Sequence, residues 1–149
     1  MKNTISFESK YGWITADEAH GSIISIKFGK RKNVNITKLL LKSKKKIIEY
    51  LNGKNIKWDL PIKLNGSPIQ EKIWKELKKI PYGKTKSYGE IANKINTSPR
   101  YIGNVCGKNR HLLAIPCHRV IRSDGSLGGF SGKGGVKLKD KLLRMEKNV

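Results

Sequence analysis

The chain has 149 residues, a length that fits one large domain or two small ones. Its 32 Lys and Arg against 11 Asp and Glu give a formal net charge of +21, which predicts a polyanionic partner, nucleic acid ahead of an anionic membrane surface. Two cysteines argue against a disulfide-stabilised scaffold, and neither a membrane-spanning apolar run nor a secretory signal is found. We therefore expect a cytoplasmic protein.

The N-terminal part of the chain predicts a sheet and one helix. Residues 3–28 are expected to form strands, because apolar and polar residues alternate at their end, with a turn over 17–21. Residues 37–52 are expected to form a helix that Gly53 ends. The predicted apolar face of this helix consists of Leu40, Leu41, Ile47, Ile48 and Leu51.

Three helix starts stand out after residue 65. Ser67-Pro68 and Ser98-Pro99 each place a serine N-cap before a proline, and Ser87 precedes Glu90 at the spacing of a capping box. The second and third helices are short and joined by a tight turn, which predicts a helix-turn-helix. In DNA-binding versions the start of the second helix approaches the duplex, and Arg100 lies there. An ordinary helical hairpin is the alternative, and the net charge favours DNA.

The remaining segment contains a short motif, a glycine-rich loop and a closing helix. The motif is Ile115-Pro116-Cys117-His118-Arg119-Val120, and a turn signal follows it at 123–126. In the loop at 128–132 the backbone can approach a ligand closely. A helix is expected over 136–146. Its predicted inward residues are Val136, Leu138, Leu142, Leu143 and Met145.

The dipeptide Cys117-His118 is the first candidate for chemistry. Only the thiolate is a good nucleophile, and a neighbouring histidine or cation can lower the thiol pKa from its usual ~8.5. Adjacent side chains in a strand point to opposite faces, so the two groups can meet only if the backbone bends after Pro116. The alternative is that Cys117 is a small buried hydrophobe, as most free cysteines are.

Two other chemistries fit these residue types less well. Cys106, His111, Cys117 and His118 are potential zinc ligands, but their spacing lacks the close pairs of a zinc finger or ribbon. A cysteine hydrolase takes its histidine base and orienting Asn or Asp from distant parts of the chain, and an immediately adjacent histidine is unusual for that class. We predict neither a metal nor a cofactor.

The order and spacing of several motifs resemble the O6-alkylguanine-DNA alkyltransferase family, the methylated-DNA–protein-cysteine methyltransferases. The motifs are IWKELKKIPYGKTKSYGEIA, SPRYIG, KN before the cysteine, IPCHRVI, GGFSG and LLRMEK. The match is close over 65–146 and looser over 1–60. The resemblance implies an α/β (α+β) fold in two domains. Residues 1–62 would form a ribonuclease-H-like α/β domain with an antiparallel sheet, and 63–149 a helical domain with a winged helix-turn-helix.

The resemblance also implies DNA repair by direct reversal. The alkyl group of O6-alkylguanine, and of O4-alkylthymine, in double-stranded DNA would pass irreversibly to Cys117 after the nucleotide is flipped out of the helix. Each molecule, a monomer without an obligate protein partner, would act once, because the thioether product has no good leaving group. The alternatives are a helix-turn-helix DNA-binding protein without chemistry and a non-repairing binder of alkylated lesions.

The catalytic residues of the family correspond to five positions of this chain. Cys117 would attack the alkyl carbon. His118 would act as a base through a water molecule, and Glu146 would orient it. Tyr88 would donate to N3 of the base, and Asn109 would brace the turn between the recognition helix and the cysteine segment.

The substrate-binding residues of the family correspond to a second set. Arg100 would fill the gap in the base stack, and small residues such as Gly103 would let the helix enter the minor groove. The backbone carbonyls of Cys117 and Val120 would accept from the exocyclic amine of the base, and Ser131 would donate to O6.

The sequence departs from the family pattern at several positions. Tyr101 is bulkier than the usual residue, Arg110-His111 replaces a frequent Asn-Pro-Leu, and Phe130 replaces a frequent tyrosine. Cys106 falls near the expected pocket wall, where we predict packing rather than a second alkylation site. For Arg119 we predict a structural or phosphate-facing role rather than a chemical one.

Overall fold

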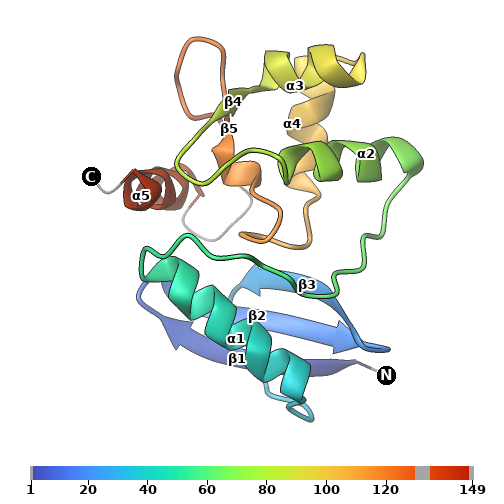
Figure 1. Ribbon diagram of the computed structural model, residues 1–149, viewed down its shortest axis with the longest axis vertical. Helices are drawn as coiled ribbons and strands as arrows, with labels where there is room; N and C mark the ends of the chain where they lie inside the picture. Colours follow the sequence, from blue (N-terminus) through green and yellow to red (C-terminus); the bar gives the residue numbers. More distant parts are fainter. Residues whose placement is uncertain (1, 130–134, 148–149) are drawn as a thin grey trace. The chain divides into compact units, whose positions relative to one another are not determined.

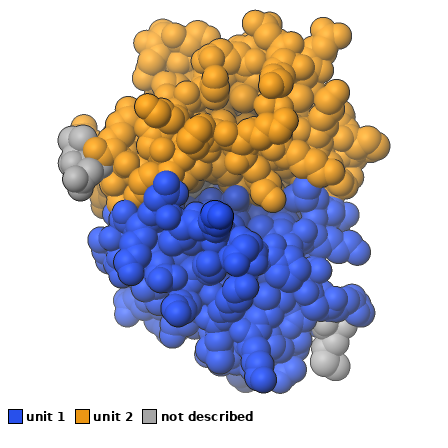
Figure 2. Space-filling model, in the orientation of Figure 1, with its two compact units in different colours: residues 1–65, 110–114 blue, residues 66–109, 115–149 orange. Residues whose placement is uncertain are grey.

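The structure is a computed structural model that describes residues 2–129 and 135–147. The chain forms two compact units, one of Met1–Asn65 with Arg110–Ala114 and one of Gly66–Asn109 with Ile115–Val149 (Figures 1 and 2). The first unit thus includes a short segment from the second half of the chain. The division into domains at 62/63 stays a prediction. Among the described residues, no helix combines the length and the apolar character needed to cross a bilayer.

The sheet of the first unit is antiparallel, with the order β1-β2-β3. Its strands are β1 (Asn3–Ser9), β2 (Gly12–Ala19) and β3 (Ser22–Phe28). β2 and β3 meet at His20 and Gly21, whose positive φ angles of 52° and 78° suit a tight hairpin turn. The turn predicted over 17–21 is therefore wrong at its start, because β2 continues to Ala19.

One face of this sheet is apolar and packs against α1 (Lys38–Leu51), which lies along the strands (Figure 1). Thr37 caps the helix, and Gly53 follows it with a φ of 90°, at the end predicted from the sequence. The predicted apolar face is wrong at Leu41, which is 54% exposed. The buried sheet residues on this side are Ile5, Phe7, Ile14, Ala16 and Ile26.

The second unit is helical. Its helices are α2 (Pro68–Leu77), α3 (Tyr88–Ile95), α4 (Pro99–Gly107), the 3₁₀ turn η1 (Cys117–Arg119) and α5 (Gly135–Glu146). The N-caps predicted at Ser67, Ser87 and Ser98 are confirmed, and the first two form complete capping boxes. Asn96, in the left-handed region, ends α3 before α4 begins, which completes the predicted helix-turn-helix.

Two short elements connect the start of α3 to the cysteine segment. β4 (Lys86–Ser87) pairs in parallel with β5 (Val120–Ile121). Tyr88 at the first residue of α3 is thereby held beside the end of the segment that contains Cys117. The mixed α/β fold class predicted from the sequence is confirmed by this arrangement of a sheet and helices.

Candidate functional site

A pocket of about 570 Å³ lies within the second unit. It brings together the starts of α3 and α4, the cysteine segment and the loop after β5. Four residues predicted to function in the site line it, namely Tyr88, Arg100, Gly103 and Cys117, together with Cys106. Residues far apart in the sequence therefore line one pocket together with the thiols of Cys106 and Cys117.

Cys117 lies in a 3₁₀ turn rather than in a strand. Pro116, with φ −82° and ψ 63°, starts the turn, and its carbonyl accepts from the amide of Arg119 at 2.9 Å. The predicted bend after Pro116 is therefore present. Successive side chains of a 3₁₀ turn diverge by about a third of a turn. His118 accordingly points into the protein interior, while Cys117 lines the pocket.

Asn109 holds the sulfur. Its Nδ2 donates to the carbonyl of Ile115 at 2.9 Å and lies 3.3 Å from Sγ of Cys117. Both side chains are buried. Asn109 comes two residues after α4 ends at Gly107, so its contacts link the end of this helix to the cysteine segment that it was predicted to brace.

A buried carboxylate lies behind the turn. Oε2 of Glu146 lies 2.8 Å from Nε2 of His118, and Oε1 accepts from the backbone amide of Gly83 at 3.0 Å. Arg119 donates to the same carboxylate from Nε at 2.9 Å and from Nη2 at 3.0 Å. Since Glu146 accepts from a guanidinium, we assign the proton of the neutral imidazole to Nε2, which makes Nδ1 the basic nitrogen.

Arg119 has a structural role. Besides its contacts with Glu146, its Nη1 donates to the carbonyl of Ile80 at 2.8 Å, and the residue is buried. Of the two roles predicted, structural or phosphate-facing, burial leaves the structural one. Arg119 therefore acts on the site by fixing the carboxylate that contacts His118.

Burial sets the charge state of both reactive groups. It raises the pKa of the Cys117 thiol, although the Asn109 hydrogen bond and the charge of Lys139 oppose the shift. It lowers the pKa of His118, with Glu146 opposing. A neighbouring cation does lower the thiol pKa, as expected, but burial outweighs it and the pKa is raised on balance. At neutral pH the site holds a thiol and a neutral imidazole, not a thiolate–imidazolium pair.

Tyr88 and Lys139 form a second polar pair at the pocket. Burial, followed by the two nearby thiols, raises the pKa of Tyr88 to about 12, so its hydroxyl stays protonated at neutral pH. Nζ of Lys139 lies 3.3 Å from the hydroxyl oxygen of Tyr88 and also donates to the carbonyl of Gly129 at 3.1 Å. Because the lysine donates to Tyr88, the hydroxyl proton of Tyr88 can point to a ligand.

The sequence predictions missed Lys139, which is fully buried. A signal was present: positions 138, 139, 142, 143 and 146 share one face of α5, at helical spacing. A lysine and a glutamate on that otherwise apolar face would have indicated two buried, paired charges. The structure instead exposes Val136, which was predicted to point inward.

The remaining predicted residues lie in different environments. Arg100 is exposed at the start of α4, and Val120 is fully buried in β5, where its amide donates to the carbonyl of Cys117. Ser131, like Phe130, lies outside the described residues. Cys106 is buried at the pocket wall, and burial raises the pKa of its thiol. Within the described ranges, no three His, Cys, Asp or Glu side chains cluster as a metal site requires.

Comparison with known families decides the assignment. The family model described as "6-O-methylguanine DNA methyltransferase, DNA binding domain" matches residues 68–148. The chain belongs to this family. As a member of the 6-O-methylguanine DNA methyltransferases, it resembles the inducible methylated-DNA–protein-cysteine methyltransferase of Bacillus subtilis, with 43% identity over 69% of this chain and 58% of that protein. A methyltransferase of the same name from Metallosphaera sedula is 44% identical over 68% of this chain and 64% of its own length. The matches thus span less than two thirds of these curated relatives.

Solved structures of the same methyltransferase family cover nearly the whole chain. The crystal structure of Mycobacterium tuberculosis OGT in complex with DNA matches with a TM-score of 0.86 at 32% identity, over 97% of this chain and 92% of that one. An O6-methylguanine DNA methyltransferase from Methanococcus jannaschii matches with a TM-score of 0.73 at 26% identity, over 96% and 93%. These matches confirm the resemblance and the fold class predicted from the sequence.

Proposed function

We propose that this chain repairs DNA by direct reversal, moving the alkyl group from O6 of alkylguanine, or from O4 of alkylthymine, to Cys117. One observation carries the proposal: a thiol held by Asn109 lines a pocket of about 570 Å³, with the His118–Glu146 pair behind it. Relatives named methylated-DNA–protein-cysteine methyltransferases, and a related structure bound to DNA, support it.

The proposed step is a displacement at the alkyl carbon. The sulfur forms a bond to that carbon while the bond from the carbon to O6 breaks, and its electron pair stays on the guanine. The thiol proton leaves through a water molecule to Nδ1 of His118, whose lowered pKa keeps it available as a base. The imidazolium then releases this proton to water and the departing guanine anion takes one up, so the net products are a neutral thioether, neutral guanine and a neutral His118.

Tyr88 and the arginines of the pocket suit the other parts of the substrate. The protonated hydroxyl of Tyr88 donates to N3 of the departing guanine and stabilises the charge that develops there. Arg122 also lines the pocket, and its charge suits a phosphate beside a flipped nucleotide. Arg100 stacks where the nucleotide has left the duplex.

The product defines the kind of catalyst. A thioether has no good leaving group, so each molecule reacts once and needs no cofactor. The partner that we propose is double-stranded DNA, bound by a monomer. The cytoplasmic location stays a prediction.

Mass spectrometry of the intact protein tests the proposal. After incubation with a duplex that contains O6-methylguanine, the protein gains the mass of one CH2 unit, because a methyl group replaces the thiol hydrogen, and Cys117→Ser gains none. Cys106→Ser is the matched control: it removes the other thiol of the same pocket and reacts like wild type. A methyl group found on Cys117→Ser would refute the site, and binding of the duplex without any mass gain would favour a non-repairing lesion binder.

A further inference from the structure

The first compact unit is as basic as the unit that holds the reactive thiol. Residues 1–65 and 110–114 carry 15 Lys and Arg against five Asp and Glu, while the rest of the chain carries 17 against six. The first unit contains neither the helix-turn-helix nor Cys117. Its positive charge therefore needs an explanation other than the pocket of the second unit.

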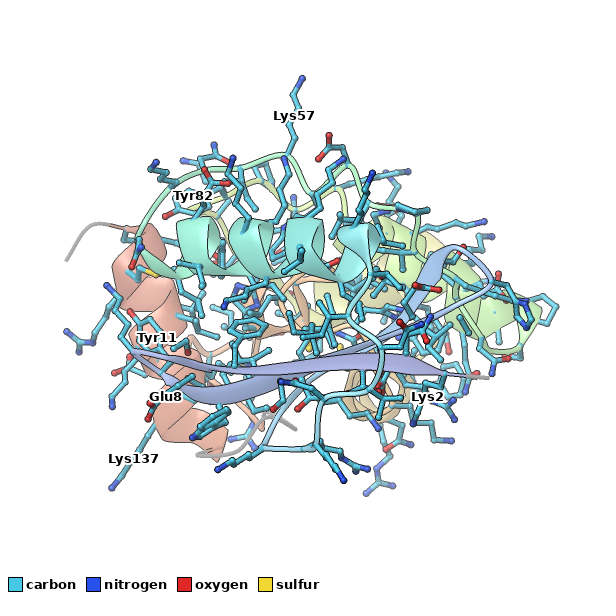
Figure 3. The ribbon with its side chains drawn as sticks, turned by 90° about the horizontal axis from the view of Figure 1, so that it is seen from below. Lys2, Glu8, Tyr11, Lys57, Tyr82 and Lys137 are labelled. Atoms are coloured by element: carbon cyan, nitrogen blue, oxygen red, sulfur yellow. The ribbon has the colours of Figure 1, made fainter. Side chains whose placement is uncertain are left out.

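Part of this charge gathers around a hollow of about 490 Å³ within the first unit. An adjoining smaller hollow of about 90 Å³ shares four of its residues. Together they form a basic trough, defined by the side chains of Lys2, His20, Lys27, Arg31, Lys63 and Arg110. Each of these six is exposed. Lys2, which precedes β1, is labelled in Figure 3.

Backbone pairing brings these residues together from separate parts of the chain. The amide of Lys63 donates to the carbonyl of Ile23 at 3.0 Å. The carbonyl of Arg110 accepts from the amide of Ile26 at 2.7 Å. Both partners lie in β3, which also contains Lys27. The segments around 62 and 111 thus align in parallel with β3, and three cations are positioned by main-chain hydrogen bonds.

The one carboxylate in the trough is already satisfied. Asp17 accepts from Thr4 Oγ1 at 2.6 Å and from Ser25 Oγ at 2.7 Å, and it lies 3.7 Å from Nζ of Lys2. It is only 9% exposed. The floor is therefore a closed polar network, and five lysine and arginine side chains are presented to solvent at the rim. Exposed lysines around such a floor suit a chain of anions rather than one buried charge.

We propose that the basic trough binds the phosphate backbone of duplex DNA, as a contact surface separate from the pocket of Cys117. This inference rests on the proposed function only for the choice of DNA over other polyanions. The partner is recognised by charge and spacing, so the contact is independent of base sequence and of the lesion. Its effect is to raise the affinity for any duplex and to make that affinity more sensitive to salt.

The test measures the affinity for an undamaged duplex by fluorescence anisotropy over a series of salt concentrations. The trough variant is Lys27→Ala/Lys63→Ala. The matched control, Lys38→Ala/Lys45→Ala, removes two exposed lysines of the same unit that lie outside the trough. Both variants lower the net charge equally. A third variant, Lys27→Arg/Lys63→Arg, keeps the charge at the trough.

The slope of log affinity against log salt is expected to fall by about 0.9 for each lysine that contacts a phosphate, hence by about 1.8 in the trough variant. The control and the arginine variant keep the wild-type slope. An equal fall of this slope in the trough variant and the control, or no fall in either, would overturn the proposal. So would a larger trough-dependent change with duplex RNA or with phosphatidylserine vesicles than with DNA.

Failure of this proposal is distinguishable from failure of the proposed function. Methyl transfer to Cys117 from free O6-methylguanine base needs no phosphate contact, so the trough variant and the control should react like wild type. If wild type transfers a methyl group while the slopes are equal, only the trough assignment is wrong. If wild type transfers none while the slopes differ as expected, only the repair function is wrong.

Discussion

Glu146 is the residue on which the geometry of the site depends. It accepts from the Gly83 amide, from the Arg119 guanidinium and from His118, and its side chain is completely buried. A buried carboxylate is stable only when its oxygens are paired. The same contacts that satisfy Glu146 also set the tautomer and the orientation of His118. Stability and the proposed chemistry therefore share one residue.

Removal of the Arg119 guanidinium should destabilise the folded protein. In Arg119→Met the carboxylate of Glu146 stays buried and loses its cationic partner, so we expect the free energy of unfolding to fall by ~3–5 kcal/mol. Urea denaturation measures the loss. Arg144→Met is the matched control. Arg144 pairs with Asp140 on the surface of α5, the helix that also contains Glu146, and this pair should contribute less than ~1 kcal/mol. Equal losses in the two variants would contradict the role given to Arg119.

The lowered pKa of His118 makes stability depend on pH. Below pH 6.5, the ordinary pKa of histidine, His118 binds a proton in the unfolded chain but stays neutral in the folded protein. The free energy of unfolding should therefore decrease as the pH falls below 6.5, by at most ~1.4 kcal/mol per pH unit, until the lowered pKa is reached. Above pH 6.5 His118 is neutral in both states, so this loss of stability is absent.

Urea denaturation of wild type and His118→Gln, repeated at several pH values, measures this effect. The variant keeps an N–H donor for Glu146 and lacks the titrating group. It should lose the part of the pH dependence that begins at 6.5. Parallel curves for the two proteins would show that His118 titrates as it does in the unfolded chain.

At the scale of elements, the start of α4 links local structure to the DNA binding that we propose. The side chain of Ser98 accepts from the amide of Tyr101 at 3.1 Å and so holds the first turn, where Arg100 lies. Ser67 caps α2 in the same way, also before a proline, but away from the pocket. Both caps use a serine hydroxyl that accepts from an N3 amide, although only Ser67 also forms a capping box with Gln70. They differ in what they position.

Replacing each cap serine by alanine distinguishes an effect on stability from an effect on DNA binding. Ser98→Ala and Ser67→Ala should each lower the free energy of unfolding by ~1 kcal/mol. Only Ser98→Ala should also weaken binding to a duplex, because it loosens the turn that presents Arg100. Chemical denaturation and fluorescence anisotropy measure the two effects. An affinity that falls equally in both variants would contradict a specific role for the start of α4.

At the scale of the whole molecule, alkylation should act on stability. Cys117 is 3% exposed and its sulfur lies 3.3 Å from Asn109 Nδ2. An added alkyl group needs volume beside packed atoms and disturbs this contact, so we expect a loss of ~1–3 kcal/mol. In a chain of this size that corresponds to a fall in Tm of about 2–4 °C per kcal/mol.

Thermal melts recorded before and after reaction with a lesion-bearing duplex, once the DNA has been removed, measure the change. Cys117→Ser, treated identically, shows what the incubation itself does. An unchanged or higher Tm of the reacted wild-type protein would contradict the prediction.

Local signals in the sequence predicted the helices of the second unit well. The caps at Ser67, Ser87 and Ser98 depend on contacts within four residues, so their spacing alone is informative. The spacing of apolar residues predicted less well which helix residues are buried. Leu41 and Val136 were predicted to point inward and are exposed. Period shows which residues share a face, but packing decides where that face ends.

The sequence by itself determined where the helices of the second unit capped by serine begin, the residue types of the site and, through its motifs, the family. Only the tertiary structure decided that Cys117 and His118 rest uncharged, that Arg119 supports Glu146 and that Lys139 contacts Tyr88. It also placed residues 110–114 with the first unit. The physical reason is the same in each case. A pKa, a buried ion pair and a pairing with a distant strand all depend on which atoms of remote segments exclude water from a group, and no local pattern encodes that.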